Sequence, residues 1–210
     1  MNSNIEWIIL DAWGVIYKIG QLVDNILIPF IKNINPQISD LLIYQEYYKA
    51  SRGKINFITF WTNLGFEKII PKIENEYIKK NSYIDKDFYE FSNKIKQTYH
   101  LALLSNDVEQ WSKTLLYKYG IYDIFDKIVI SGEVGYRKPE KEIYNILLSQ
   151  INTLPSRCIF VDDTMKNLYT AAEIGMNTIR FLRDDSKVAS CFEFEVNNFT
   201  ELYTTIVNFF

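Results

Sequence analysis

Four short runs of apolar residues constrain most strongly how this chain can fold. They lie at residues 5–10, 101–104, 128–130 and 159–161, and none alternates strictly with polar residues. Runs of this kind are typical of strands buried on both faces of a parallel sheet. Because a helix signal follows each run, the order strand, helix, strand, helix predicts a doubly wound, parallel α/β domain.

Local signals predict where several of these helices begin. Asp107 and Gln110 have the spacing of a capping box, which satisfies the free N–H groups at a helix start. Pro139 is expected in the first turn of the next helix, where its missing N–H is tolerated. Asn198 and Glu201 repeat the capping pattern at the start of a last helix.

Residues 17–97 interrupt the alternation of strands and helices. Their apolar residues recur every three or four positions, and Gly53, Gly65 and Pro71 are expected to divide them into several short helices. This spacing predicts a small helical domain inserted between the first and second strands.

The insertion divides the rest of the chain into two segments. Residues 1–16 and 98–210 would together form the α/β core, with the helical domain between them. We expect hinges at Gly20 and near Thr98, where the chain would cross between the two parts.

Composition excludes several classes of protein. Hydrophobic residues make up 48% of the chain and charged residues 23%, as in soluble globular domains. The net charge of −3 offers no basic stripe for phosphates, so nucleic acid is not expected as a partner. The apolar stretch near the N-terminus ends at Asp11 with no basic region before it. We therefore expect neither a signal peptide nor a membrane span, and a cytoplasmic location.

Histidine and cysteine chemistry have little support in this sequence. The single histidine, His100, excludes a histidine metal cluster and argues against a Ser-His-Asp arrangement, so we expect a structural role for it. Cys158 and Cys191 lie far apart and form no metal-binding or redox pair, which fits a reducing compartment. Motifs for nucleotide triphosphates, dinucleotides and serine hydrolases are absent. Any chemistry therefore falls to carboxylates.

Polar residues follow three of the predicted strands at the point where each strand ends. Asp11 follows the first, Ser105 and Asn106 the second, and Asp162 and Asp163 the run at 159–161. In a doubly wound sheet, ligands bind at this edge. Three carboxylates gathered there would repel one another, so they need a shared proton or a cation. Oxygen ligands of this kind suit Mg²⁺.

Four blocks of sequence, in the order DAWGV, LLSND, GYRKPEKEIY and FVDDTMKNLYTAAEIGM, resemble the haloacid dehalogenase (HAD) superfamily of hydrolases. The last two blocks are the most specific for the family. The segment GKINFITFW is similar to part of the helical cap of one subgroup, which includes sugar phosphatases and the phosphatase domain of soluble epoxide hydrolases. The resemblance implies a Rossmann-like HAD core with a helical cap at residues 17–97.

The resemblance also implies roles for the acidic residues. Asp11 would be the nucleophile that attacks phosphorus and forms an aspartyl-phosphate. The backbone carbonyl of Trp13 and the side chain of Asp163 would join Asp11 around Mg²⁺. Asp162 would lie close to the ion or bind it through water.

Further roles concern the phosphoryl group and the substrate. The Ser105 hydroxyl and the Asn106 N–H would hold a phosphoryl oxygen, and Lys138 would neutralise the nucleophile and the transferring group. Asn167 matches a position that supports the metal-binding loop. Arg52 is a candidate anchor for an anionic substrate, although a solvated helix end accounts for it equally well.

One position departs from the pattern of the family's phosphatases. They usually carry a second aspartate two residues after the nucleophile, which serves as general acid, and here that position is Trp13. Proton transfer of this kind contributes about 10²- to 10⁴-fold in rate.

Three functions remain open after this departure. The first is a Mg²⁺-dependent phosphatase acting on a small phosphorylated metabolite. The second is a 2-haloacid dehalogenase, because a departing halide needs no proton; the paired Asp162 and Asp163 argue against it, since the dehalogenases resemble a metal-free version without this pair. The third is a catalytically silent HAD-fold binding or regulatory protein. The sequence does not predict the oligomeric state.

Overall fold

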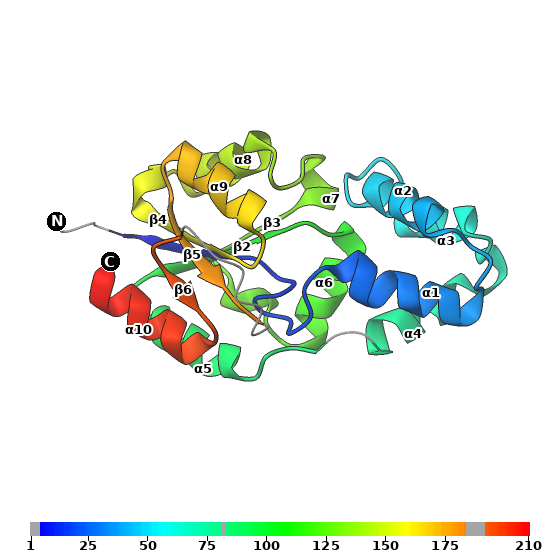
Figure 1. The fold of residues 1–210 in the computed structure, drawn as a ribbon, viewed down its shortest axis with the longest axis horizontal. Helices are drawn as coiled ribbons and strands as arrows, with labels where there is room; N and C mark the ends of the chain where they lie inside the picture. Colours follow the sequence, from blue (N-terminus) through cyan, green and yellow to red (C-terminus); the bar gives the residue numbers. More distant parts are fainter. Residues whose placement is uncertain (1–4, 81–82, 184–191) are drawn as a thin grey trace.

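A computed structural model describes residues 5–80, 83–183 and 192–210. Six strands form one sheet in the order β3-β2-β1-β4-β5-β6, and every pair of neighbours is parallel (Figure 1). The strands are β1 (Trp7–Leu10), β2 (His100–Ser105), β3 (Lys127–Ile130), β4 (Cys158–Asp162), β5 (Asn177–Phe181) and β6 (Glu195–Val196). The predicted parallel α/β architecture is therefore confirmed, and all four apolar runs form strands.

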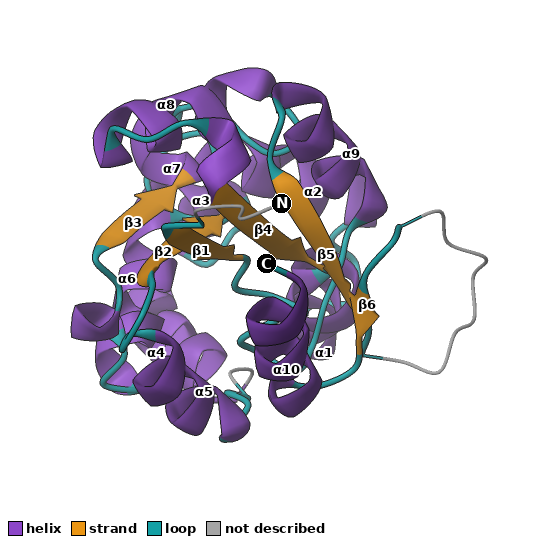
Figure 2. Ribbon diagram, turned by 90° about the vertical axis from the view of Figure 1, so that its left-hand side faces the viewer, coloured by secondary structure: helices purple, strands orange, loops and turns teal. Residues whose placement is uncertain are grey.

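Helices cover both faces of this sheet (Figure 2). Ile9 of β1 packs on one face with residues of two helices, and Ile8 and Leu10 pack on the other face with residues of three. The helices on the Ile9 face are α8 (Lys141–Ile151) and α9 (Met165–Ile174). The helices on the opposite face are α5 (Asp87–Ile95), α6 (Glu109–Lys118) and α10 (Phe199–Phe209). Because successive strand residues point to opposite faces, both faces demand apolar side chains, which explains the lack of alternation.

Between β1 and β2, the regular elements of the described residues are all helical, apart from two isolated β-bridges. It contains a π-helical turn (Val23–Leu27), α1 (Ile28–Ile34), α2 (Asp40–Ala50), α3 (Phe57–Asn63), a 3₁₀ turn (Glu67–Ile69), α4 (Ile70–Lys80) and α5. We call residues 17–80 the helical insert. Its helices α1 to α4 lie beyond the edge of the sheet in Figure 1. Pro71 does not divide two helices, because it lies in the first turn of α4.

The predicted boundary at residues 97 and 98 differs from the packing of α5. Phe88 and Phe91 of α5 lie 5.6 and 5.1 Å from the ring of Phe199 on α10, so α5 covers the sheet. The segment that leaves the core and the segment that returns to it meet at an isolated β-bridge between Tyr17 and Ile84. We therefore propose that the core resumes near residue 83, which moves the second crossing away from Thr98.

Two of the predicted helix starts are wrong. α6 begins at Glu109, and the carboxylate of Asp107 does not cap it; Gln110 instead contacts Thr114. α8 begins at Lys141, so Pro139 precedes the helix. The third start is confirmed, because the Asn198 side chain accepts a hydrogen bond of 2.8 Å from the N–H of Glu201.

An aromatic cluster joins the helical insert to the core. Trp111 of α6 lies 5.1 Å from Phe60, 5.8 Å from Trp61 and 4.8 Å from Tyr77. Glu74 of α4 is half-buried beside the two indoles, and burial raises the pKa of its carboxyl to about 7. Counting the described residues alone, one of its oxygens is buried without a hydrogen-bond partner.

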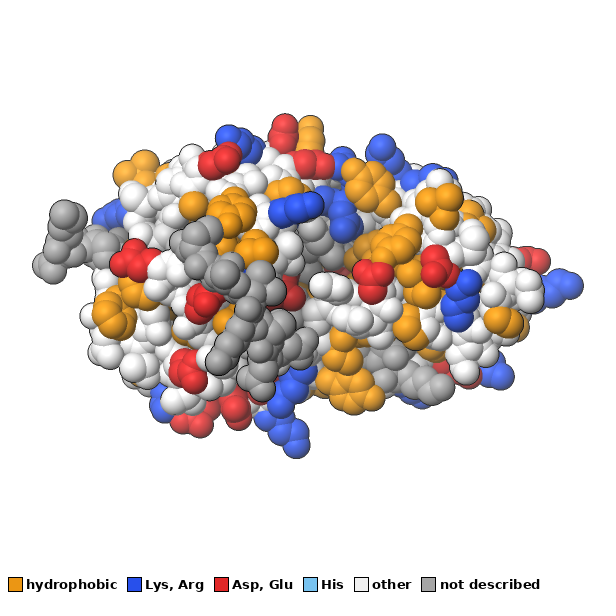
Figure 3. All heavy atoms as spheres, viewed as in Figure 1, with side chains coloured by type: hydrophobic (Ala, Val, Ile, Leu, Met, Phe, Trp, Pro, Cys, Tyr) orange, Lys and Arg blue, Asp and Glu red, His pale blue; other side chains and the backbone are white. Residues whose placement is uncertain are grey.

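The surface and the cysteines add little to the assignment of function. On the face drawn in Figure 3, basic and acidic side chains are interspersed. No helix of the described residues has both the length and the apolar character needed to cross a membrane.

His100 stacks on Trp7 with ring centroids 4.7 Å apart. Cys158 is buried and reduced, and Cys191 lies outside the described residues.

Candidate active site

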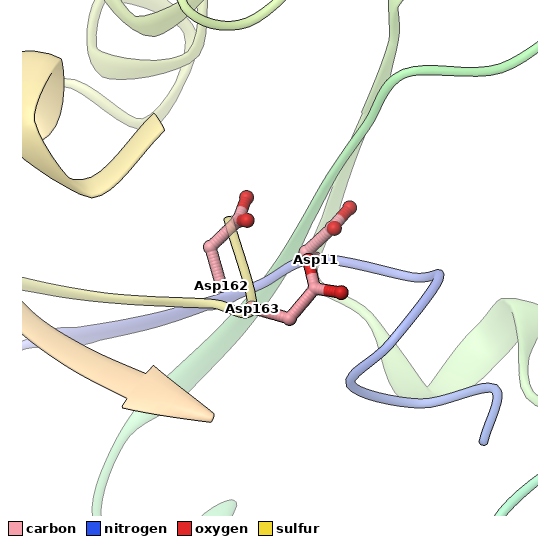
Figure 4. A group of neighbouring side chains, drawn as sticks. All are labelled: Asp11, Asp162 and Asp163. Carbon is pink, nitrogen blue, oxygen red and sulfur yellow. The ribbon is translucent and has the colours of Figure 1, made fainter. Parts of the chain in front are cut away.

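The fold brings the three predicted acids together at one edge of the sheet. β1 and β4 are neighbours, with Leu10 paired to Val161, so Asp11 lies next to Asp162 where both strands end. One carboxylate oxygen from each of Asp11, Asp162 and Asp163 lies within 4.8 Å of the others (Figure 4). The structure thus places side by side the three acids that the strand ends indicated.

Lys138 lies between two of these acids. Its Nζ is 2.7 Å from Asp11 Oδ1 and 2.7 Å from Asp162 Oδ2, and its side chain is only 1% exposed. Burial raises the pKa of Asp11; Lys138 lowers that pKa, while Asp162 and Asp163 raise it further. Burial lowers the pKa of Lys138, but the two acids outweigh this and raise it above its ordinary value. One lysine cannot balance three carboxylates, so the cluster favours a bound cation.

Asp162 and Asp163 differ in how many hydrogen bonds they already accept. Asp162 is fully buried and accepts bonds from Lys138, from the Asn167 amide at 3.0 and 3.1 Å, and from the Thr164 N–H at 2.8 Å. Asp163 accepts one from the Thr164 hydroxyl at 2.9 Å. Burial and the charge of Asp162 raise the pKa of Asp163 to about 6. Asp163 therefore has more free capacity for a ligand than Asp162.

The loop after β1 leaves one backbone carbonyl available. The Gly14 N–H donates to the carbonyls of Tyr17 and Ile19 at 2.9 and 3.1 Å. In a trans peptide the N–H and C=O point in opposite directions, so the Trp13 carbonyl points away from these acceptors. Within the described part of the chain, no hydrogen bond is donated to it. This carbonyl is thus free for a metal ion.

Gly14 also fixes where Asp163 can lie. Its φ of +84° falls in the left-handed region, and a Cβ on it would meet Asp163 Oδ2 at 2.1 Å. Only glycine combines this backbone conformation with so close an approach. Gly14 of the first sequence block therefore serves the geometry of the acid cluster.

Ser105 and Asn106 provide two unused donors beside the acids. The Ser105 hydroxyl is buried and has no hydrogen-bond partner in the described part of the chain. Among the described residues, none accepts a hydrogen bond from the Asn106 N–H. Buried polar groups normally have hydrogen-bond partners, so unpaired donors at such a site indicate that they bind a ligand. A phosphoryl oxygen fits both.

The Asn106 side chain has a second role that sequence reasoning missed. Its amide donates to the Lys138 carbonyl at 2.8 Å and accepts from the Lys138 N–H at 2.8 Å. This pair of bonds fixes the backbone that carries the buried ammonium group. Residues 106 and 138 lie 32 positions apart, so no local sequence signal could have revealed the pairing.

Trp13 lines the cavity above the acids, and its single donor is already used. The ring is 8% exposed, and its Nε1–H donates to Asp107 Oδ2 at 3.2 Å. Asp107 also accepts the N–H of Val108 at 2.7 Å, and burial raises its pKa to about 7. The residue expected to cap a helix thus holds the indole.

A cavity of about 220 Å³ lies between the helical insert and the core. Arg52, the candidate substrate anchor, does not line it: Arg52 forms an ion pair with Glu140 and contacts the Gly135 carbonyl at 3.4 Å. The arginine in the wall is Arg137, which bonds to Ser51 of the insert. Other wall residues are Asp11, Gln21, Asp24, Tyr44, Lys138 and Asp163.

Comparison with known proteins identifies the class to which this fold and site belong. The family model for haloacid dehalogenase-like hydrolases matches residues 5–175, which is most of the chain. The chain belongs to this hydrolase family, as the sequence blocks indicated.

Two relatives narrow the comparison. The chain is 25% identical over 190 residues to D-ribitol-5-phosphate phosphatase from Bacteroides thetaiotaomicron, and the match covers 84% of this chain and 91% of the relative. It is 33% identical over 106 residues to drimenol cyclase drtB from Aspergillus calidoustus, with 49% of this chain and 20% of that protein covered. The chain thus spans most of the first relative and a fifth of the second.

Two solved structures share the fold. A HAD-family enzyme from B. thetaiotaomicron, crystallised with magnesium and inorganic phosphate, superposes with a TM-score of 0.71 at 21% identity, covering 89% of this chain and all of that one. L-2-haloacid dehalogenase from Xanthobacter autotrophicus superposes with a TM-score of 0.72 at 14% identity. That match covers 98% of this chain and all of the dehalogenase chain. At these identities the likeness concerns the fold alone.

Proposed function

We propose that this protein is a Mg²⁺-dependent phosphatase that acts on a small phosphorylated metabolite. The observation that carries the proposal is the cluster of three carboxylates with one buried lysine, flanked by the unpaired donors of Ser105 and Asn106. The relative named for a ribitol phosphate and the neighbour crystallised with magnesium and phosphate support it.

The residues present fit a magnesium ion. Asp11, the free carbonyl of Trp13 and Asp163 would hold it, because each offers an oxygen not saturated by protein donors. Asp162, which already accepts four hydrogen bonds in the structure, would orient Lys138 rather than bind the ion directly. The ion would supply charge neutralisation at the phosphoryl oxygens.

The chain's own residues carry the reaction. Asp11 would attack phosphorus, so that an Asp11–phosphate bond forms while the bond to the ester oxygen breaks. Ser105, Asn106 and Lys138 would stabilise the charge on the phosphoryl oxygens. The departing oxyanion would take its proton from solvent. Water would then attack the aspartyl-phosphate and give its proton to solvent, releasing inorganic phosphate and restoring the Asp11 carboxylate. The Trp13 indole supplies no acid for the leaving group.

A dehalogenase remains the second candidate, since the aromatic Trp13 occupies the place of the general acid and a halide leaves without a proton. The cluster of Asp11, Asp162 and Asp163 supports the phosphatase instead, because three carboxylates beside one lysine need a cation.

The test is a screen of phosphorylated metabolites and 2-haloacids, each with Mg²⁺ or with a chelator. We expect phosphate release that requires Mg²⁺ and disappears in Asp11→Asn, whose amide is a poor nucleophile. Circular dichroism controls for folding of this variant. Metal-independent halide release would favour the dehalogenase, and a folded wild type without either activity would favour a binding or regulatory role.

A further inference from the structure

Arg183 follows β5 and reaches the loop that carries the nucleophile. Its Nε donates to the Gly14 carbonyl at 3.2 Å, and its Nη2 donates to the Val15 carbonyl. Its Nη1 pairs with Asp85 Oδ2 at 2.5 Å. The side chain is 15% exposed, and nothing in the sequence blocks singled it out.

The two carbonyls held by Arg183 belong to consecutive peptide units, directly after the Trp13 carbonyl. A planar guanidinium with several donors in a fixed fork can hold two such carbonyls at once, which a lysine cannot do in the same way. Arg183 therefore fixes the two peptide units that follow Gly14. The bonds from the Gly14 N–H to the carbonyls of Tyr17 and Ile19 fix the peptide unit that precedes it.

The guanidinium is itself held in place. It lies 4.6 Å from the ring centroid of Phe181 and 5.9 Å from that of Phe199. Asp85 is buried, its N–H donates to the Ile16 carbonyl at 2.9 Å, and Lys18 lies 3.8 Å away. Arg183 thus stands where the nucleophile loop, the return crossing from the insert and the end of β5 meet.

We propose that Arg183 is a positioning residue for the metal site: it fixes the backbone at residues 14 and 15, which keeps the Trp13 carbonyl and the Asp163 carboxylate in place. The link to Asp163 is the close approach of Gly14, where even a Cβ would lie 2.1 Å from Oδ2. The inference rests on the proposed function, because it assigns Arg183 to the same cation site.

The experiment compares Arg183→Lys and Arg183→Gln with Arg180→Gln. Arg180 lies on the same strand end and is also paired with one acid, Glu195, at 3.0 Å, but within the described residues no hydrogen bond joins it to the loop. Calorimetry measures the Mg²⁺ affinity of each free protein. Hydrogen exchange of the peptide spanning residues 11–20 is followed without metal, and kcat and KM are measured with the best phosphate ester.

We expect both Arg183 variants to lose roughly tenfold or more in Mg²⁺ affinity, as supporting residues of metal sites do. Exchange of the 11–20 peptide should accelerate, and kcat should fall more than KM changes, because Ser105 and Lys138 are untouched. Arg180→Gln should bind Mg²⁺ within about twofold of wild type. Asp85→Asn removes the charge pair but leaves both carbonyl bonds, so it should also retain its affinity.

The results separate this inference from the proposed function. Wild-type affinity and exchange in Arg183→Lys would overturn the inference while leaving the phosphatase intact, and so would an equal loss in Arg180→Gln, which would indicate general destabilisation. Absence of Mg²⁺ binding in the wild type would refute both the proposed cation site and the role assigned to Arg183 there.

Discussion

Replacing Trp13 with aspartate tests the consequence of the missing general acid. The indole donates its only N–H to Asp107 and cannot protonate a leaving oxygen in the cavity. We therefore expect wild type to hydrolyse aryl phosphates, whose leaving groups need little assistance, and alkyl phosphates poorly. An aspartate at position 13 should recover part of the roughly 10²- to 10⁴-fold that general acid catalysis contributes, chiefly for alkyl esters.

The structure also sets the cost of this substitution. Trp13 is 8% exposed and packs on Tyr17 with ring centroids 4.8 Å apart, so loss of the ring should destabilise the fold by about 3–5 kcal/mol. Asp107 would lose the hydrogen bond from the indole N–H, which adds about 1–3 kcal/mol to the loss of folding stability. It would also face the new carboxylate at position 13. Because a domain has only about 5–15 kcal/mol of stability, the variant should be combined with Asp107→Asn, which removes that charge.

The assay compares kcat/KM for p-nitrophenyl phosphate and for glycerol phosphate. Trp13→Phe, made in the same Asp107→Asn protein, is the matched control, since it retains an aromatic ring and provides no acid. Thermal unfolding establishes that each variant is folded at the assay temperature. If the folded Trp13→Asp, Asp107→Asn protein shows the same ratio of aryl to alkyl rates as Trp13→Phe, the reasoning is refuted, and the acid comes from elsewhere or phosphate esters are the wrong substrates.

Two further predictions concern stability and the metal site. The raised pKa of Glu74, from 4.5 to about 7, means that the folded state gains stability when this carboxyl is protonated and loses it as the pH rises through that range. Because the group is only half-buried, we expect Glu74→Gln to stabilise the protein by about 1–2 kcal/mol at pH 8 and by a few tenths at pH 4.5, measured by denaturant unfolding; equal stability at pH 8 would contradict this. Gly14→Ala should weaken Mg²⁺ binding roughly tenfold or more by displacing Asp163, whereas Gly65→Ala has the same φ of +84° and no neighbour within 4 Å, so calorimetry should show unchanged affinity there. Equal losses in both would mean that backbone strain, and not contact with the acid, is responsible.

The sheet and the acid cluster were predictable because each rests on short-range signals. Runs buried on both faces identified the strands, and the polar residue at each strand end identified the site, since parallel strands finish at one edge. Glycine and proline were less informative. Pro71 and Pro139 both mark positions near helix starts, but their place relative to the first turn depends on the neighbouring packing.

The supporting contacts of the site could not be predicted in the same way. Asn106 holds the backbone of Lys138, and Asp107 holds the indole of Trp13, across 32 and 94 positions of sequence. Such pairs form only when β1, β2 and the segment before α8 are brought to one edge. The position of α5 was missed for a related reason, because its amphipathic spacing suits a helical bundle and the face of a sheet equally well.

Trp13 and Asp107 are better understood together than separately. An indole in the acid's place would leave its N–H facing the cavity, where it could act as a hydrogen-bond donor to substrate; the buried Asp107 removes that possibility by accepting it. The ring then presents only its apolar surface beside Asp11, the proposed nucleophile. Such a wall offers no proton donor to a leaving group. The range of substrates should therefore follow from the intrinsic ease with which their leaving groups depart, and the insert's Gln21, Asp24 and Tyr44 would act on binding and not on this chemical step.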